Sequence, residues 1–241
     1  MASAEYLWKG ALCDMEKRTL ILGAYDTAAH GWTLAKCKIT KAQQVQTFIT
    51  VPGRYAPIDA STYLTDGQPY YGNAALDVVL ECSEGDRNHR KQLIDELINY
   101  VDGRNLDLIH PDHPDHYLVG RVQASSDYSD LAHCAVTIGA VCEPWLWAAN
   151  ETTITLTGSS TEKTASVPIY GRLAVVPTVT VTGSITISFE DYTWALSAGE
   201  HILPELFLTP SEVPGEPNTH SVRYQGSGKA VLTFREAVLA A

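Results

Sequence analysis

The pattern of hydrophobic and polar positions changes along the chain and predicts two β-rich parts with one helix in the first. In the first part, short runs rich in β-branched and aromatic residues alternate with turns marked by Gly and Pro. These runs predict strands at 19–22, 46–51, 76–82, 105–109, 117–124 and 133–141. The run at 46–51 ends at Pro52-Gly53, a dipeptide typical of a turn.

Residues 86–101 have the spacing of an amphipathic helix. Their apolar positions fall on one helical face, at Leu93, Ile94, Leu97, Ile98 and Val101. Ser83 or Asp86 can cap the start, and Gly103 lies where a helix commonly ends in a left-handed residue. We expect a single helix that packs on a sheet and exposes a charged face without a functional site.

The pattern changes again near Cys142–Trp147, where Pro144 is expected to interrupt any strand. Beyond it, charged residues become fewer and Thr, Ser and Val alternate with period two. Strands are predicted at 152–157, 177–182, 184–189, 200–208, 221–225 and 230–235. The spacing is typical of an antiparallel sandwich. We therefore predict a mainly β protein with an N-terminal domain at 1–145 and a β-sandwich domain at 146–241.

Composition describes a soluble globular protein of 241 residues, with 45% hydrophobic and 19% charged residues. The net charge of −11 disfavours sequence-specific nucleic-acid binding, which needs a basic surface. It does not exclude a protein that DNA merely passes. No apolar run approaches the roughly 20 residues of a membrane span, and the first residues do not resemble a secretion signal, so we expect a protein made in a cytosol.

Five cysteines, an odd number without CxxC spacing, favour free and mostly buried thiols over a disulfide framework. They stand at Cys13, Cys37, Cys82, Cys134 and Cys142.

The segment His110-Pro-Asp-His-Pro-Asp-His116 is the strongest candidate for a metal site, because imidazoles and carboxylates ligate zinc. Its two prolines instead favour a stiff turn between two strands, with nothing that aligns the imidazoles. We favour a solvated loop and predict no metal ligand.

Other candidates for chemistry are weaker. Gly226-Ser-Gly-Lys229 resembles the end of a phosphate-binding loop, but Ala230 replaces the required Ser or Thr and a strand follows, so we predict a turn. Paired carboxylates of the kind that a glycosidase uses occur at Asp14 and Glu16, Asp59 and Asp66, and Glu190 and Asp191. Nothing in the sequence places any pair at catalytic separation. We predict no catalytic or cofactor-binding residue and no enzyme.

Aromatic residues in or beside the second domain could form a sugar-stacking platform, or could pack in the core and at the joint between the domains. They are Trp145, Trp147, Tyr192, Trp194 and Tyr224. We favour packing.

The order of short motifs along nearly the whole chain resembles the distal tail protein (Dit) family of long-tailed bacteriophages and prophages. The matching pieces are Tyr25–Thr27, Gly31–Leu34, Val51–Arg54, Ile58–Ser61, Tyr70–Cys82, Asn99–Arg104, Asp115–Val122, Cys142–Trp145 and Gly226–Arg235. Two places depart from the family pattern: Tyr55–Pro57 lacks an expected glycine, and His110–His116 is unusually rich in His.

The resemblance implies an N-terminal belt domain that closes into a homohexameric ring and a galectin-like C-terminal sandwich. The implied role is a hub in the virion tail, assembled in the bacterial cytoplasm, that joins the tail tube to the tip or baseplate and leaves a channel for DNA. The implied partners are other copies of the chain, the major tail tube protein and the tail tip protein, with the tape measure and receptor-binding proteins as further partners. It names no interface residues. An acidic channel wall would let DNA slide without adhering.

Two alternatives from other classes stay open. One is a monomeric carbohydrate-binding module that uses the second domain, and the other is a glycan-active enzyme with an unlocated carboxylate pair.

Overall fold

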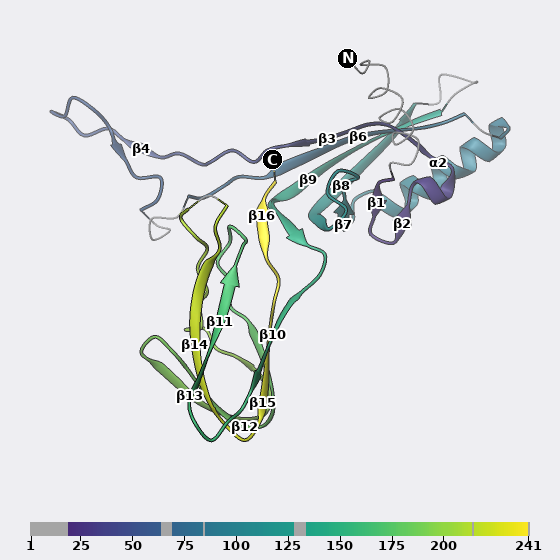
Figure 1. The fold of residues 1–241 in the computed structure, drawn as a ribbon. Coiled ribbons are helices and arrows are strands. Elements are labelled where there is room, and N and C mark those ends of the chain that lie inside the picture. The colour runs from purple at the N-terminus through teal and green to yellow at the C-terminus, as the bar shows by residue number, and fades with distance from the viewer. Residues whose placement is uncertain (1–18, 64–68, 84, 128–133, 214, 241) are drawn as a thin grey trace, which may run out of the picture. The chain divides into compact units, whose positions relative to one another are not determined.

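The computed structural model describes residues 19–63, 69–83, 85–127, 134–213 and 215–240. The chain divides into two compact units, Met1–Leu146 with Leu239–Ala241, and Trp147–Val238. Figure 1 shows the fold, with strands predominating and one long helix, α2. The mainly β fold class predicted from the sequence is confirmed.

The first unit is built on an antiparallel sheet whose strands lie in the order β2-β1-β7-β8-β9-β6-β3, with β16 also paired to β9. Its strands are β1 (Ile21–Leu22), β2 (Tyr25–Asp26), β3 (Thr33–Thr40), β6 (Ala74–Cys82), β7 (Asn105–Ile109), β8 (His116–Asp127), β9 (Cys134–Ala148) and β16 (Ala237–Leu239). A short 3-10 helix, η1 (Ala28–His30), follows β2.

The central strands bury alternate side chains, as the period of a β-strand requires. Along β6, every second residue from Ala74 to Cys82 is buried. The directly opposite residues of β9, from Cys142 back to Cys134, are buried in the same rhythm. One face of the sheet therefore carries the core of this unit.

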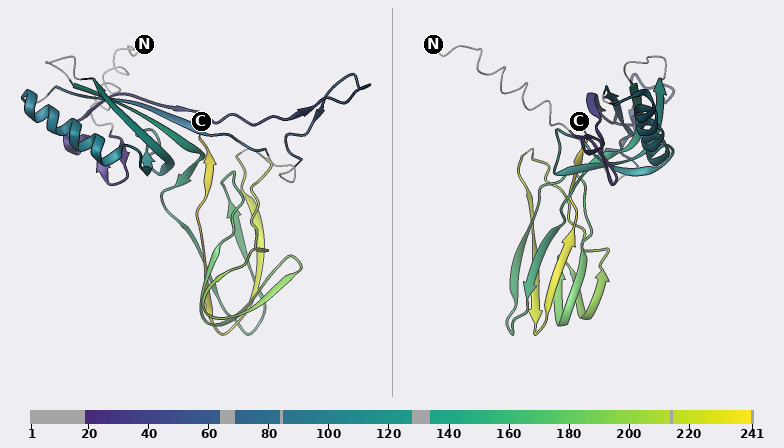
Figure 2. Two further views of the ribbon diagram at one scale, coloured as in Figure 1. Left: turned by 180° about the vertical axis from the view of Figure 1, so that it is seen from behind. Right: turned by 90° about the vertical axis from the view of Figure 1, so that its right-hand side faces the viewer.

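The predicted helix is confirmed as α2, which spans Arg87–Val101 and packs near β8. Asp86 caps its start, because the carboxylate accepts a hydrogen bond from the amide of His89 at 2.8 Å. Ile94, Leu97 and Val101 are buried, as the helical spacing predicts. Figure 2 shows α2 beside the strands of the first unit from two further directions.

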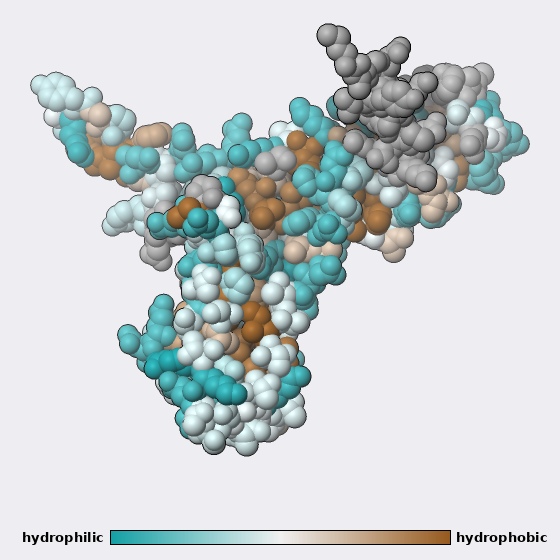
Figure 3. Space-filling view, viewed as in Figure 1, coloured by the Kyte–Doolittle hydropathy of each residue, from teal (hydrophilic) through white to brown (hydrophobic). Residues whose placement is uncertain are grey.

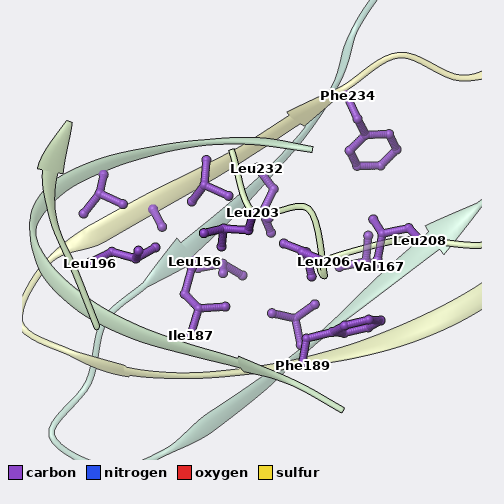
Figure 4. Close-up of a cluster of buried hydrophobic side chains, with 14 of the residues drawn as sticks. Leu156, Val167, Ile187, Phe189, Leu196, Leu203, Leu206, Leu208, Leu232 and Phe234 are labelled. Carbon is purple, nitrogen blue, oxygen red and sulfur yellow. The ribbon is translucent and has the colours of Figure 1, made fainter. Parts of the chain in front are cut away.

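The second unit contains a six-stranded antiparallel sheet curled around its own core, ordered β10-β15-β12-β14-β11 with β13 paired to β12. The strands are β10 (Thr152–Thr157), β11 (Lys163–Ile169), β12 (Thr178–Phe189), β13 (Tyr192–Ile202), β14 (Asn218–Gly226) and β15 (Lys229–Phe234). Figure 4 shows side chains from these strands converging, with Leu156, Ile187 and Phe189 among them. The turn predicted at 226–229 joins β14 to β15.

Three sequence predictions in this region are wrong. Pro144 does not interrupt β9, because β6 begins at Ala74, opposite Cys142, and so does not reach position 144. The Pro144 carbonyl accepts a hydrogen bond from the amide of Ala240 at 2.8 Å. The two strands predicted on either side of Gly183 are one strand, β12. Its pairing register shifts around Gly183, which has a positive φ of 87°. A bulge of this kind bends a strand without ending it.

The predicted strand at 200–208 is the third error. Strand β13 ends at Ile202, and Leu206 turns back to bond the carbonyl of Leu203 at 2.9 Å. Pro204 lacks the amide proton that a continued ladder would use. Strands β3 and β11 were not predicted at all.

Candidate assembly surface

The sequence-predicted candidates for chemistry do not form a reactive site in the described residues. The segment 110–116 is the turn between β7 and β8, in which the amide of His113 bonds the His110 carbonyl at 2.9 Å. The amide of Asp112 donates to Nδ1 of His110 at 3.1 Å. Among the described residues, no group of three His, Cys, Asp or Glu side chains is placed to hold a metal ion.

The predicted carboxylate pairs do not form a reactive site in the described residues either. Asp14, Glu16 and Asp66 lie outside the described residues. Asp59 is exposed and accepts from the amide of Ser61 at 2.9 Å, and hydrogen bonds from Ser61 lower its pKa. Glu190 and Asp191 are exposed in the turn between β12 and β13.

Four of the five predicted aromatic residues have ring or core contacts within their own units, although Tyr192 remains 48% exposed. In the first unit, Trp145 meets Tyr71 edge to face, with ring centroids 5.9 Å apart. In the second unit, Trp194 packs against the buried core together with Tyr224, and Tyr192 stacks on Trp194. These contacts favour the packing interpretation over a sugar-binding platform.

A long hairpin between β3 and β6 lies in the stretch that carries several of the short motifs identified in the sequence. We call residues 43–63 and 69–72 the arm. It continues the β3–β6 ribbon, since the amide of Gly72 bonds the Gln43 carbonyl at 2.9 Å and Val45 bonds Tyr70 at 2.8 Å. Further out, β4 (Phe48–Ile49) pairs only with β5 (Ile58–Asp59). Figure 1 shows the arm extending past the other strands of its sheet.

The short motifs at 51–54 and 58–61 fix the shape of the arm. In Val51-Pro-Gly-Arg54, Gly53 has φ of 85° and the amide of Arg54 bonds the Val51 carbonyl at 3.1 Å. A proline followed by a left-handed glycine is the pattern of a type II turn. In Ile58–Ser61, the Ser61 hydroxyl accepts from the amide of Thr47 at 2.8 Å and so joins the two strands.

Both faces of the arm expose apolar side chains. Phe48 is 55% exposed and its neighbour Ile49 is 50% exposed, although adjacent strand residues point to opposite faces. Tyr63, at 83%, is also exposed. Figure 3 shows hydrophobic surface gathered on the arm around β4. The full set of exposed large apolar residues in the arm is Val45, Phe48, Ile49, Tyr55, Ile58, Tyr63 and Tyr70.

The arm is also poor in charge, with only Arg54 and Asp59 between residues 43 and 63. Aromatic enrichment and charge depletion are typical of the core of a protein interface. A two-stranded hairpin without a packed face is marginally stable in water. The arm therefore has the composition of a protein interface. Contact with another protein surface would also stabilise it.

The motifs at 25–27 and 31–34 contribute to the packing of the first unit. The Thr27 hydroxyl is buried and bonds both the amide and the carbonyl of Leu20, at 3.1 and 2.9 Å. The indole of Trp32 donates to the Tyr25 hydroxyl at 3.1 Å, and Tyr25 stacks on His30. Burial raises the pKa of Tyr25. These contacts hold β1, β2 and η1 together.

Within the described residues, no helix is long and apolar enough to cross a membrane.

Comparison with known proteins gives a structural match without a sequence match. No family model matches the chain, and no curated protein matches it. A solved structure that is similar is that of the SPP1 Dit (gp 19.1) protein, which is described as a paradigm of the hub adsorption apparatus in phages that infect Gram-positive bacteria. The TM-score is 0.59 at 14% sequence identity, and the match covers 90% of this chain and 98% of that one. The chain thus has a fold similar to that of the SPP1 Dit protein over nearly its whole length.

Proposed function

We propose that this protein is a structural component of a phage tail, a ring-shaped hub that joins the end of the tail tube to the tip or baseplate. The observation that carries the proposal is the exposed apolar arm on a fold similar to that of a phage hub protein. The ring is a homohexamer, and its centre leaves a channel for DNA. The protein acts by shape and contact, without catalysis, and resides in the virion after assembly in the bacterial cytoplasm.

In this proposal, the neighbouring copy of the chain covers the arm. A ring forms when every subunit offers one surface and receives its neighbour's complementary surface, head to tail. The arm is a single protrusion per subunit with apolar residues on both faces, so a neighbour has to cover both. Burial of Phe48 and Ile49 would remove their apolar surface from water and drive association.

The partners at the two ends of the ring are the tail tube protein on one side and tail tip proteins on the other. The net charge of −11 supports a channel that DNA traverses without adhering, because like charges repel over a short range in salt. The C-terminal unit, as a galectin-like sandwich, is the part available to peripheral tail proteins.

Molar mass in solution tests the ring. Light scattering on the purified chain is expected to give about 158 kDa for six copies, against 26.3 kDa for one. The measurement is repeated on the chain co-produced with tail tube and tail tip proteins of the same phage, since a ring can require its partner. A monomer in both preparations would refute the hub.

A pair of variants tests the role of the arm. The double substitution Phe48→Ser and Ile49→Ser is expected to leave the folded subunit as stable as before, because both side chains are exposed, and to shift the protein from ring to monomer. Phe207→Ser is the matched control, since Phe207 is also 50% exposed but lies in the second unit. Equal loss of the ring in both variants would contradict a specific role for the arm.

A further inference from the structure

Cys82 and Cys134 face each other across two central strands of the first unit. Strands β6 and β9 run antiparallel, and the register places Cys82 directly opposite Cys134. Both side chains are buried, in the same alternating rhythm as their neighbours Leu80 and Val136. The two sulfur atoms therefore lie on the same face of the sheet, on adjacent strands.

The backbone spacing of this pair suits a covalent link. Directly opposed residues of antiparallel strands have Cα atoms about 4.5 or 5.5 Å apart, and a disulfide needs roughly 4.4–6.8 Å. Sγ of Cys134 lies 3.3 Å from the carbonyl oxygen of Cys82, to which the thiol donates. The Cys134 sulfur thus lies against the residue that it would bond.

No other pair among the described cysteines has this geometry. Cys142 lies roughly 26 Å from Cys134 along β9, given the rise per residue of an extended strand. Cys37 lies opposite Val78, which is about 13 Å along β6 from Cys82. All four described cysteines are reduced thiols in this structure. A disulfide within the described chain can therefore form at one place only.

We propose that Cys82 and Cys134 form an oxidation site, which a peroxide converts to an intramolecular disulfide that joins β6 to β9. In the first step one sulfur attacks hydrogen peroxide, so that an S–O bond forms, the O–O bond breaks and water leaves. The second sulfur then attacks the first, an S–S bond forms, the S–O bond breaks and a second water leaves. The two thiols lose two electrons and two protons, and one peroxide becomes two waters.

The link would close the segment that contains α2, β7 and β8. Closing a long segment restricts the unfolded chain and so favours the folded state. If the proposed function holds, the hub leaves a reducing cytoplasm with the virion and meets oxidising surroundings, where such a link persists. The chemistry of the pair itself does not depend on that function.

The test is a map of the thiols in the full chain before and after oxidation. Reduced protein is treated with hydrogen peroxide at mildly alkaline pH, because burial raises the pKa of the Cys134 thiol. It is then unfolded, alkylated and digested for mass spectrometry. The expected product is about 2 Da lighter than the reduced chain and yields a linked peptide that contains Cys82 and Cys134. Cys82→Ser and Cys134→Ser should each abolish the linked peptide, and Cys142→Ser should retain it.

The proposal is overturned if Cys82 and Cys134 stay fully alkylated while a dithiol standard in the same tube is oxidised. It is also overturned if the link joins another cysteine, including Cys13, or joins two chains. The linked peptide is sought in the protein without substitutions, so the test remains decisive if a variant fails to fold. The molar mass of the ring is measured separately, so either proposal can fail without the other.

Discussion

Individual polar residues of the first unit stabilise its fold rather than perform chemistry. The Asp26 carboxylate accepts hydrogen bonds from the Thr19 hydroxyl and from the amides of Ala28 and Ala29, the two amides at 3.0 and 3.3 Å. The bond from Thr19 is the largest cause of a lowered pKa for Asp26. Because the ionised form is favoured in the folded state, Asp26 stabilises the fold above its ordinary pKa of 3.8.

Asp26→Asn is therefore expected to lower the free energy of unfolding at pH 7 by about 1 kcal/mol, through weaker hydrogen bonds to a neutral acceptor. The difference from the wild type should shrink as pH falls below 3.8, because protonation makes Asp26 neutral as well. Urea unfolding across pH measures this. Asp115→Asn, on the exposed loop before β8, controls for the loss of one charge. A difference that is independent of pH would contradict the argument.

At the scale of elements, the arm and the helix show two opposite ways of holding a segment in place. Helix α2 buries a continuous apolar face and is capped by Asp86. The arm has tight turns and cross-strand hydrogen bonds, yet its apolar side chains remain exposed. Local hydrogen bonds define the path of the arm, while none of the described residues buries its apolar side chains.

The helix cap gives a prediction at this scale. Asp86→Ala should lower the free energy of unfolding by about 1 kcal/mol, since the amide of His89 loses its acceptor. Asp86→Ser keeps a side-chain oxygen at the cap and should lose much less. Chemical denaturation followed by circular dichroism distinguishes the two variants. Equal stability of the Ala and Ser variants would show that the cap contributes nothing.

At the scale of the whole molecule, each unit has its own core. The second unit begins and ends on neighbouring strands, since β10 pairs with β15 and the amide of Ala148 bonds the Glu236 carbonyl at 2.9 Å. Its buried cluster runs from Leu156 to Phe234 and lies wholly within the unit. The ends of this unit therefore meet, as expected of a domain inserted as a closed piece.

Residues 147–238, produced alone, are expected to fold as a soluble β protein with a single cooperative thermal transition, because no core residue of the cluster is removed. Calorimetry and circular dichroism check this, with the full chain as the reference. A broad, non-cooperative transition would mean that the second unit depends on the first. If the proposed function holds, this piece should form no ring, because the arm is absent.

The sequence predicted well where a local pattern decides the structure. Helical spacing located α2 to within a residue, and the strands predicted at 105–109 and 152–157 have the observed bounds of β7 and β10. The sequence-based prediction failed where the extent of a strand depends on the strands that pair with it. Pro144 is tolerated because β6 begins opposite Cys142 and does not reach position 144, and β12 continues through Gly183 because three other strands pair with its two halves.

The same division applies to the assembly surface. The residues Val51–Arg54 by themselves determined a turn, since this depends on the φ preferences of Pro52 and Gly53. Only the tertiary structure decided that Phe48 and Ile49 are exposed on both faces, and that Cys82 lies opposite Cys134. Exposure and register are set by which distant strands come together, and a one-dimensional pattern cannot distinguish an apolar residue in a core from one that awaits a partner.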